Sequence, residues 1–296
     1  MDAYTNITTA EDYVQAAWEL RPLPAIALEI ARLAENPEST AQDFQRVIEG
    51  DPVLTARIVT AARVNYFSEK ASQVRDVHHA VVSMGLTATR NLTLGLCIHG
   101  AFSPDDDDDA KVDQEEFWNH SLAVAAGARI IAQSIGEPRD ELAFLMGLLH
   151  DIGKAIMNDV TPERVDRLVS AAARTGKSLW EAEHAILGFG HAEVGGLAAA
   201  KWHVPAPVPE VIAAHHEPLV AVDTDPLFHV IKVADTLAYA AGHGFSGVVR
   251  RPELPKEVAA ALGLSDTQIE AMCALLDSHL ARVRPMFGIP AQPHAA

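Results

Sequence analysis

The sequence predicts an all-α protein. Apolar residues recur at helical spacing in most segments, as in residues 24–35, and the alternation of Val, Ile or Thr that would indicate a strand is scarce. Signals for helix starts recur as well, because Thr40 precedes Asp43 by three residues and Asp51 precedes a proline. With 296 residues, 49% of them hydrophobic, the chain is long enough for one large domain or two ordinary ones.

The N-terminal part, residues 14–104, is predicted to form a compact helical bundle. Thr40 can cap one of its helices, since its side chain accepts a hydrogen bond from a free backbone N–H group, and Pro52 suits the first turn of another. The expected helices cover 24–35, a segment from Thr40, a segment from Asp51-Pro52, 76–86 and 88–98.

An acidic run separates this part from the rest of the chain. Five aspartates, Asp105 to Asp109, follow Ser103 and Pro104. Such a run repels itself and stays solvated. It lacks the spaced ligands and the turn glycine of a calcium loop, so residues 105–111 are interpreted as a linker.

The C-terminal part, residues 112–285, is predicted to be a second helical domain that packs against the first. Ser178 and Glu181 have the spacing of a capping box, and so do Ser265 and Gln268. The expected helices cover 114–135, 139–152, a segment from Thr161-Pro162, 179–187, 190–202, 208–216, 226–242, 255–262 and 265–283.

Charge and cysteine content restrict the class of partner. The formal net charge is −17, which argues against electrostatic binding to nucleic acid or to an anionic membrane. Cys97 and Cys273 lie far apart among apolar residues and read as buried thiols of a reducing compartment. The first residues have no signal-peptide pattern, and no apolar stretch reaches the ~20 residues of a membrane helix. We expect a soluble, cytoplasmic protein, with its oligomeric state left open.

The pair His150-Asp151 is the most unusual polar feature. It follows residues 143–149, which are almost entirely apolar and therefore predict a buried helix. An ionised carboxylate at the end of such a helix needs a partner. Two interpretations remain at this point. The pair either binds a cation and an anionic ligand, or forms a His–Asp hydrogen bond that stabilises the core.

Other polar residues share apolar helix faces. His120 lies on the stripe of Phe117 and Val124, and Asp235 lies between Ile231 and Ala238. A single such residue is commonly a satisfied core group, but a collection of nitrogen and oxygen donors can build one or two metal sites in a bundle. The candidate metal ligands are His120, His150, Asp151, His191, His215, His216 and Asp235.

This set suits zinc, iron or manganese, because it contains histidine and carboxylate without thiolate. Asp151, next to His150, is the natural bridge between two metals. Paired metals activate water and hold a phosphoryl group. Lys154, one turn after His150, could hold a phosphate as a point charge, or could be an ordinary lysine at a helix end.

The order of motifs resembles the HD superfamily of metal-dependent phosphohydrolases. Over residues 18–240 the motifs are Asn119-His120, His150-Asp151-Ile-Gly-Lys154, Gly190-His191, His215-His216-Glu217 and Val233-Ala-Asp235. The first hundred residues resemble the HDOD branch of bacterial signalling proteins. The segments that carry this likeness are Leu23-Pro24, Asp51-Pro52-Val-Leu-Thr-Ala-Arg57, Asn65-Tyr66-Phe67 and Ala80-Val-Val-Ser-Met-Gly85.

The resemblance implies two kinds of function. HDOD domains are regulatory modules, and many lack the metal ligands that this chain retains. The retained set is similar to that of the HD-GYP branch, which hydrolyses cyclic di-GMP. That likeness implies one metal site of His120, His150, Asp151 and Asp235, and a second of Asp151, His191, His215 and His216, with Glu116 as an extra ligand. The Asp-Gly and Gly-Tyr-Pro stretch of HD-GYP proteins is absent after Glu217.

We therefore expect a regulatory signalling protein that retains one or two metal ions and binds a protein partner or a nucleotide second messenger. The alternative is a metal-dependent phosphodiesterase that acts on a nucleotide such as a cyclic dinucleotide, with Asp151 and Lys154 as catalytic residues. A third interpretation is an HD fold without metal, in which the histidines satisfy one another.

Overall fold

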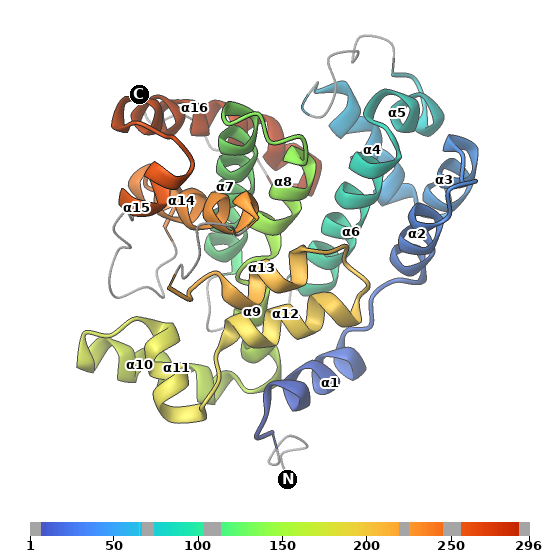
Figure 1. Ribbon diagram of the computed structural model, residues 1–296. Coiled ribbons are helices and arrows are strands. Elements are labelled where there is room, and N and C mark those ends of the chain that lie inside the picture. Colours follow the sequence, from blue (N-terminus) through green and yellow to red (C-terminus); the bar gives the residue numbers. More distant parts are fainter. Residues whose placement is uncertain are drawn as a thin grey trace. The chain divides into compact units, whose positions relative to one another are not determined.

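The computed structural model describes residues 7–64, 66, 74–103, 114–218, 225–244 and 256–289. Throughout these ranges the regular elements are helices, with no strand, which confirms the all-α prediction (Figure 1). The acidic linker at 105–111 lies outside the described ranges, as do Asn65 and Phe67 of the HDOD-like motif.

The chain divides into two compact units. Unit 1 comprises Met1–Pro22 and Phe102–Leu276, and unit 2 comprises Leu23–Ala101 and Asp277–Ala296. This division differs from the predicted domain limits at both ends. Helix α1 (Ala10–Leu20) belongs to unit 1, and the C-terminal end of α16 (Asp266–Val283) belongs to unit 2.

Unit 2 follows the predicted helix order closely. Thr40 accepts a hydrogen bond from the backbone N–H of Asp43, which confirms the predicted cap. Helix α4 begins at Pro52 as predicted, and the Asp51 carboxylate caps it by accepting from Val53 N at 2.8 Å. Its elements are α2 (Ala25–Glu35), α3 (Ala41–Ile48), α4 (Pro52–Arg63), α5 (Val77–Met84), α6 (Leu86–Phe102) and the short 3₁₀ helix η2 (Arg284–Phe287).

Unit 1 is built around α7 (Gln114–Ser134), which packs against α8 (Asp140–Leu149) and α14 (Pro226–Ala240). Every residue of α8 from Leu142 to Leu149 is buried, as its apolar sequence predicts. The remaining helices are α9 (Ile152–Val160), α10 (Pro162–Thr175), α11 (Leu179–Leu187), α12 (His191–Lys201), α13 (Val208–Ala214) and α15 (Lys256–Ala261).

Helix α1 begins earlier than the predicted domain limit. Thr9 and Asp12 form a capping box, in which Thr9 Oγ1 accepts from Asp12 N at 3.1 Å and the Asp12 carboxylate accepts from Thr9 N at 2.9 Å. The fully buried Tyr13 shares a hydrogen bond of 2.6 Å with the Thr161 hydroxyl. These contacts tie α1 to unit 1.

The predicted helix over 139–152 is wrong at its end. Helix α8 ends at Leu149 and α9 begins at Ile152, because Asp151 leaves helical geometry with ψ near 8°. The break turns the side chains of His150 and Asp151 out of a regular helical face. Both residues therefore lie at a helix junction, where they can face several other helices.

No single helix in the described ranges is long and apolar enough to cross a membrane. The consecutive helices α5 and α6 reach the required length and hydropathy only when they are taken together, and the chain bends by 115° between them.

Candidate metal centre

The seven predicted ligands meet in unit 1. They come from α7, the α8–α9 junction, the start of α12, the residues just after α13, and α14. The ligand atoms of each of two groups lie within 4.8 Å of one another. Group A is His120, His150 and Asp235, and group B is Asp151, His191, His215 and His216.

Asp151 lies between the two groups, with one carboxylate oxygen directed at each. Its Oδ1 atom is 3.3 Å from His191 Nε2 and 3.6 Å from His215 Nε2. Its Oδ2 atom is 3.3 Å from His150 Nε2 and 3.9 Å from His120 Nε2. This is the placement that a carboxylate needs to bridge two ions.

The donor spacing fits metal coordination. Donors about 2.0–2.2 Å from an ion at tetrahedral angles lie about 3.3–3.6 Å from each other. The distance from His120 Nε2 to Asp235 Oδ1 is 3.3 Å, and the distances around Asp151 Oδ1 fall in the same range. Both groups could therefore close around an ion with small movements.

Three of the histidines are held in one tautomer by backbone carbonyls. His120 Nδ1–H donates to His243 O at 2.9 Å, and His150 Nδ1–H donates to Gly147 O at 2.8 Å. His215 Nδ1–H donates to Ile212 O at 2.6 Å. Each Nε2 atom then carries the lone pair that faces the cluster. Fixing the outer nitrogen of a histidine in this way is typical of metal ligands.

Several atoms of the cluster have no hydrogen-bond partner among the residues that the structure describes. His120 Nε2, His215 Nε2 and Asp151 Oδ1 are buried and unpaired. An unsatisfied buried polar group costs about 1–3 kcal/mol. Three such atoms directed at one cluster are explained by a cation that all of them could bind, so the residues fit a metal centre.

Glu183 is a site residue that the sequence did not reveal. It lies in α11 with 2% of its surface exposed, and its Oε2 accepts from His191 Nδ1 at 2.6 Å and from His191 N at 3.0 Å. It is a buried carboxylate that orients a histidine, the usual outer partner of a metal ligand. The sequence around Glu183 contains no recognisable motif. Only the burial of its side chain in α11, which the structure reveals, marks it as a residue of the site.

Two glycines allow the helices of the site to approach closely. A Cβ atom on Gly153 would lie 1.9 Å from His191 O, so α9 and α12 touch backbone to backbone. A Cβ on Gly147 would lie 2.6 Å from Ala125 Cα, where α8 meets α7. These crossings bring Asp151 to His191 and His150 to His120.

A comparison with models of protein families shows to which family this chain belongs. The model of the HDOD domain matches residues 20–218, about two thirds of the chain. This chain belongs to the HDOD family. An uncharacterised protein of Treponema pallidum is 25% identical to it over 219 residues, which is 73% of this chain and 42% of that protein. The HDOD chain thus spans less than half the length of this curated relative.

Solved structures share the fold. An HDOD domain protein of unknown function from Geobacter sulfurreducens has a TM-score of 0.71 at 24% identity, covering 94% of this chain and 99% of its own. A candidate signal transduction protein from Marinobacter aquaeolei also has a TM-score of 0.71 at 24% identity, covering 99% and 68%. At this identity the likeness concerns the fold alone.

Protonation in this HDOD chain suits a cation. Burial raises the pKa of Asp151, but the charges of His150 and Lys154 outweigh it and hold that pKa well below its usual range. Burial lowers the pKa of His215, and that of His216 further. Burial also opposes protonation of His150 and His191, but the charges of Asp151 and Glu183 outweigh it and raise the pKa values of these two histidines. Metal binding needs an ionised carboxylate and neutral imidazoles, so an ion would have to compete with protons at His150 and His191 but not at His215 and His216.

Lys154 lies in the site and is not an exposed residue of a helix end. Its Nζ atom is 2.6 Å from Asp151 Oδ2, and 11% of its side chain is exposed. The ammonium therefore neutralises the oxygen that also faces group A. Glu116 does not join either ligand group.

Proposed function

We propose that this HDOD chain is a signalling protein that holds one or two divalent metal ions and acts by binding a partner protein or a nucleotide. The observation that carries the proposal is Asp151, which directs one oxygen at each of two histidine groups. Within the described ranges, its Oδ1 atom and the Nε2 atoms of His120 and His215 are buried without a hydrogen-bond partner. A core stabilised only by His–Asp hydrogen bonds would not leave such atoms unpaired.

The assignment of ligands follows the distances. Group A with Asp151 Oδ2 would hold one ion, and group B with Asp151 Oδ1 the other. Histidine and carboxylate donors suit iron, manganese or zinc. When bound, such ions supply Lewis acidity and lower the pKa of coordinated water.

The charge of the centre favours an anionic ligand. Two divalent ions carry more positive charge than Asp151 and Asp235 neutralise, and Lys154 adds a cation at the same place. A phosphate group of a nucleotide is an anion that such a centre would attract. This supports a nucleotide as a ligand of the signalling protein.

Phosphodiester hydrolysis is the second candidate function, and the position of Lys154 favours it. Its ammonium lies 2.6 Å from Asp151 Oδ2. If an ion coordinated Asp151, the ammonium could pair with a phosphate oxygen instead and neutralise the charge of the phosphate. Asp235 and the histidines of group A would hold an ion that, when bound, supplies Lewis acidity to the phosphate. The absence of the Asp-Gly and Gly-Tyr-Pro stretch after Glu217 argues against cyclic di-GMP as the substrate.

Elemental analysis tests the proposal. Protein purified without added metal, and again after reconstitution, is compared with Asp151→Asn. His79→Ala serves as a control, because His79 belongs to unit 2 and lies 2.8 Å from the cap residue Asp76 of α5, whereas the seven candidate ligands belong to unit 1. One or two equivalents of iron, manganese or zinc, lost in Asp151→Asn and kept in the control, are expected. Protein without metal under both conditions would refute the centre.

A turnover assay then separates the two functions. Cyclic dinucleotides and linear phosphodiesters are offered to the metal-loaded protein and to His120→Ala. Binding of a nucleotide without turnover supports the signalling role. Turnover that disappears in His120→Ala, while the melting temperature is preserved, would instead establish a phosphodiesterase.

A further inference from the structure

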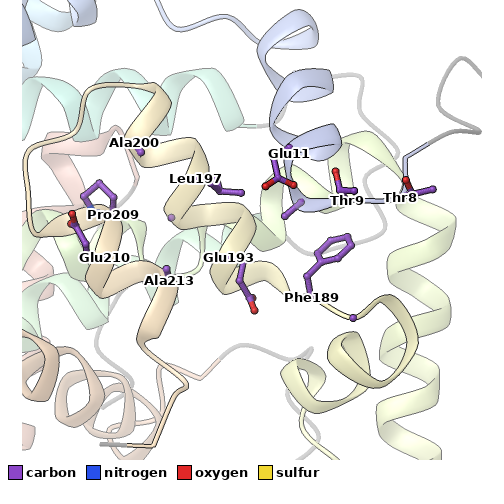
Figure 2. Close-up of a pocket in the computed structure, with 13 residues that line it drawn as sticks. Thr8, Thr9, Glu11, Phe189, Glu193, Leu197, Ala200, Pro209, Glu210 and Ala213 are labelled. Atoms are coloured by element: carbon purple, nitrogen blue, oxygen red, sulfur yellow. The ribbon is translucent and has the colours of Figure 1, made fainter. Parts of the chain in front are cut away.

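A groove separate from the metal centre crosses the outer side of α12. It has a volume of about 610 Å³ and is lined by Thr8–Glu11 at the start of α1, the Gly188–Phe189 turn, α12 and α13 (Figure 2). None of the seven candidate ligands lines it. It lies wholly within unit 1.

The floor of the groove is apolar because small residues lie between larger ones. Gly196, Ala200 and Ala213 leave room that Phe189 and Leu197 border. A Cβ on Gly196 would already lie 2.8 Å from Ala213 Cβ, so α12 and α13 are in close contact beneath the groove. Leu197 is 38% exposed, which is a high value for a leucine in the middle of a helix.

The wall formed by α1 is firmly anchored. Arg164 Nη1 donates to Ile7 O at 2.7 Å, and Lys201 Nζ donates to Gln15 Oε1 at 2.7 Å. Tyr13 is buried against Phe189, with ring centroids 6.0 Å apart. The groove is therefore a formed feature of the surface and not a gap between loosely packed helices.

Carboxylates surround the apolar floor. Glu11 and Glu210 lie on opposite sides of α12, on α1 and α13, and both are exposed (Figure 2). Within the described part of the chain no ion pair engages either of them. Glu193 also lines the groove, and its carboxylate is 2.7 Å from His184 Nε2.

We propose that this groove binds a segment of a partner protein that presents an apolar side chain flanked by lysine or arginine. The apolar floor would bury the former, and Glu11 and Glu210 would pair with the latter. A small molecule would stay largely exposed in a groove bordered by exposed residues, whereas a peptide segment can cover it. The inference rests on the proposed partner-binding function and gives that partner its chemistry.

The groove is also well placed for signalling. Helix α12 begins at His191 and carries Leu197 on the groove side, and α13 ends just before His215 and His216. A segment bound in the groove would contact α12, which begins at the candidate ligand His191, and α13, which ends one residue before His215.

Selection from a displayed library of random linear peptides on the full-length protein tests the proposal. The enriched peptides are expected to combine Leu, Phe or Trp with Lys or Arg. Their affinities are then measured by fluorescence anisotropy against wild type, Leu197→Asp, and a double variant carrying Glu11→Lys and Glu210→Lys. Both variants should bind at least about tenfold more weakly. Glu270→Lys and Val82→Asp, exposed substitutions elsewhere on the chain, should bind like wild type.

Three results would refute the proposal that the groove binds such a segment. They are a selection that enriches no peptide, enriched peptides without basic residues, and peptides that bind both groove variants as tightly as wild type. Metal content, measured on the same samples, keeps the two proposals apart. Metal-free protein that selects basic apolar peptides would refute only the centre, and metal-loaded protein that selects none would refute only the groove.

Discussion

Replacing Gly153 by alanine should disturb the candidate centre although it replaces none of the seven candidate ligands. The added Cβ would lie 1.9 Å from His191 O and 2.8 Å from Gly195 N, whereas ordinary contacts begin at 3.4 Å. Helices α9 and α12 would have to separate by about 1.5 Å, since the atoms in the way belong to the backbone. Overpacking of a core costs about 1–3 kcal/mol and sometimes more.

The same movement would separate ligands. Asp151 precedes α9 and His191 begins α12, so their present distance of 3.3 Å would grow beyond what one ion can span. We expect Gly153→Ala to lose the ion of group B and to melt roughly 6–12 °C below wild type, taking about 3 kcal/mol and 2–4 °C per kcal/mol.

The assay is thermal melting by circular dichroism, with metal content measured on reconstituted protein. Gly100→Ala is the matched control, because nothing lies within 4 Å of its added Cβ and it also lies in a helix. Gly195→Ala should give a smaller shift of the same sign, since its closest contact would be 3.0 Å, to the side chain of Ile212. A Gly153→Ala protein that melts with the control and keeps all its metal would refute the packing argument.

Three further predictions concern other buried groups. Glu183→Gln should weaken metal binding about 10- to 100-fold, measured by competition with a chelating dye, because the amide orients His191 less well; Glu270→Gln is the control, and equal affinities would contradict the role of Glu183. Burial, aided by the charge of Arg57, lowers the pKa of His99 to about 3. The unfolded chain therefore binds the extra proton below its ordinary pKa, and the free energy of unfolding should fall by about 2 kcal/mol from pH 7 to pH 5 on account of this group. In His99→Leu that part of the pH dependence should be lost. If the free energy of unfolding, measured by urea titration at each pH, falls as much in His99→Leu as in wild type, the role of His99 is contradicted. Burial also raises the pKa of the Cys97 thiol to about 12. In Cys273→Ser, iodoacetamide should label no thiol until the protein is denatured, and rapid labelling of the native variant would show that Cys97 is accessible.

Local signals in the sequence were enough for most helices. The caps at Thr40, Asp51 and Ser178 are hydrogen bonds between residues two or three apart, so the sequence contains both partners. The candidate ligands were also recognisable, because His120 and Asp235 interrupt apolar helix faces and His150-Asp151 ends an apolar helix. The predicted start at residue 14 missed the cap of α1, although Thr9 and Asp12 have the same spacing as the caps that were recognised.

Other features depend on how the helices pack and on where they break. Glu183 becomes a site residue only because the start of α12 packs over it, and Lys154 is drawn to Asp151 by the break between α8 and α9. The groove likewise needs α1, α12 and α13 side by side. By itself the sequence determined most of the helices and the chemical types of the candidate ligands, since these follow from short-range hydrogen bonds and periodicity. Tertiary structure alone decided the distances among those ligands and the orientation of their side chains, because both arise where backbones meet at Gly147 and Gly153.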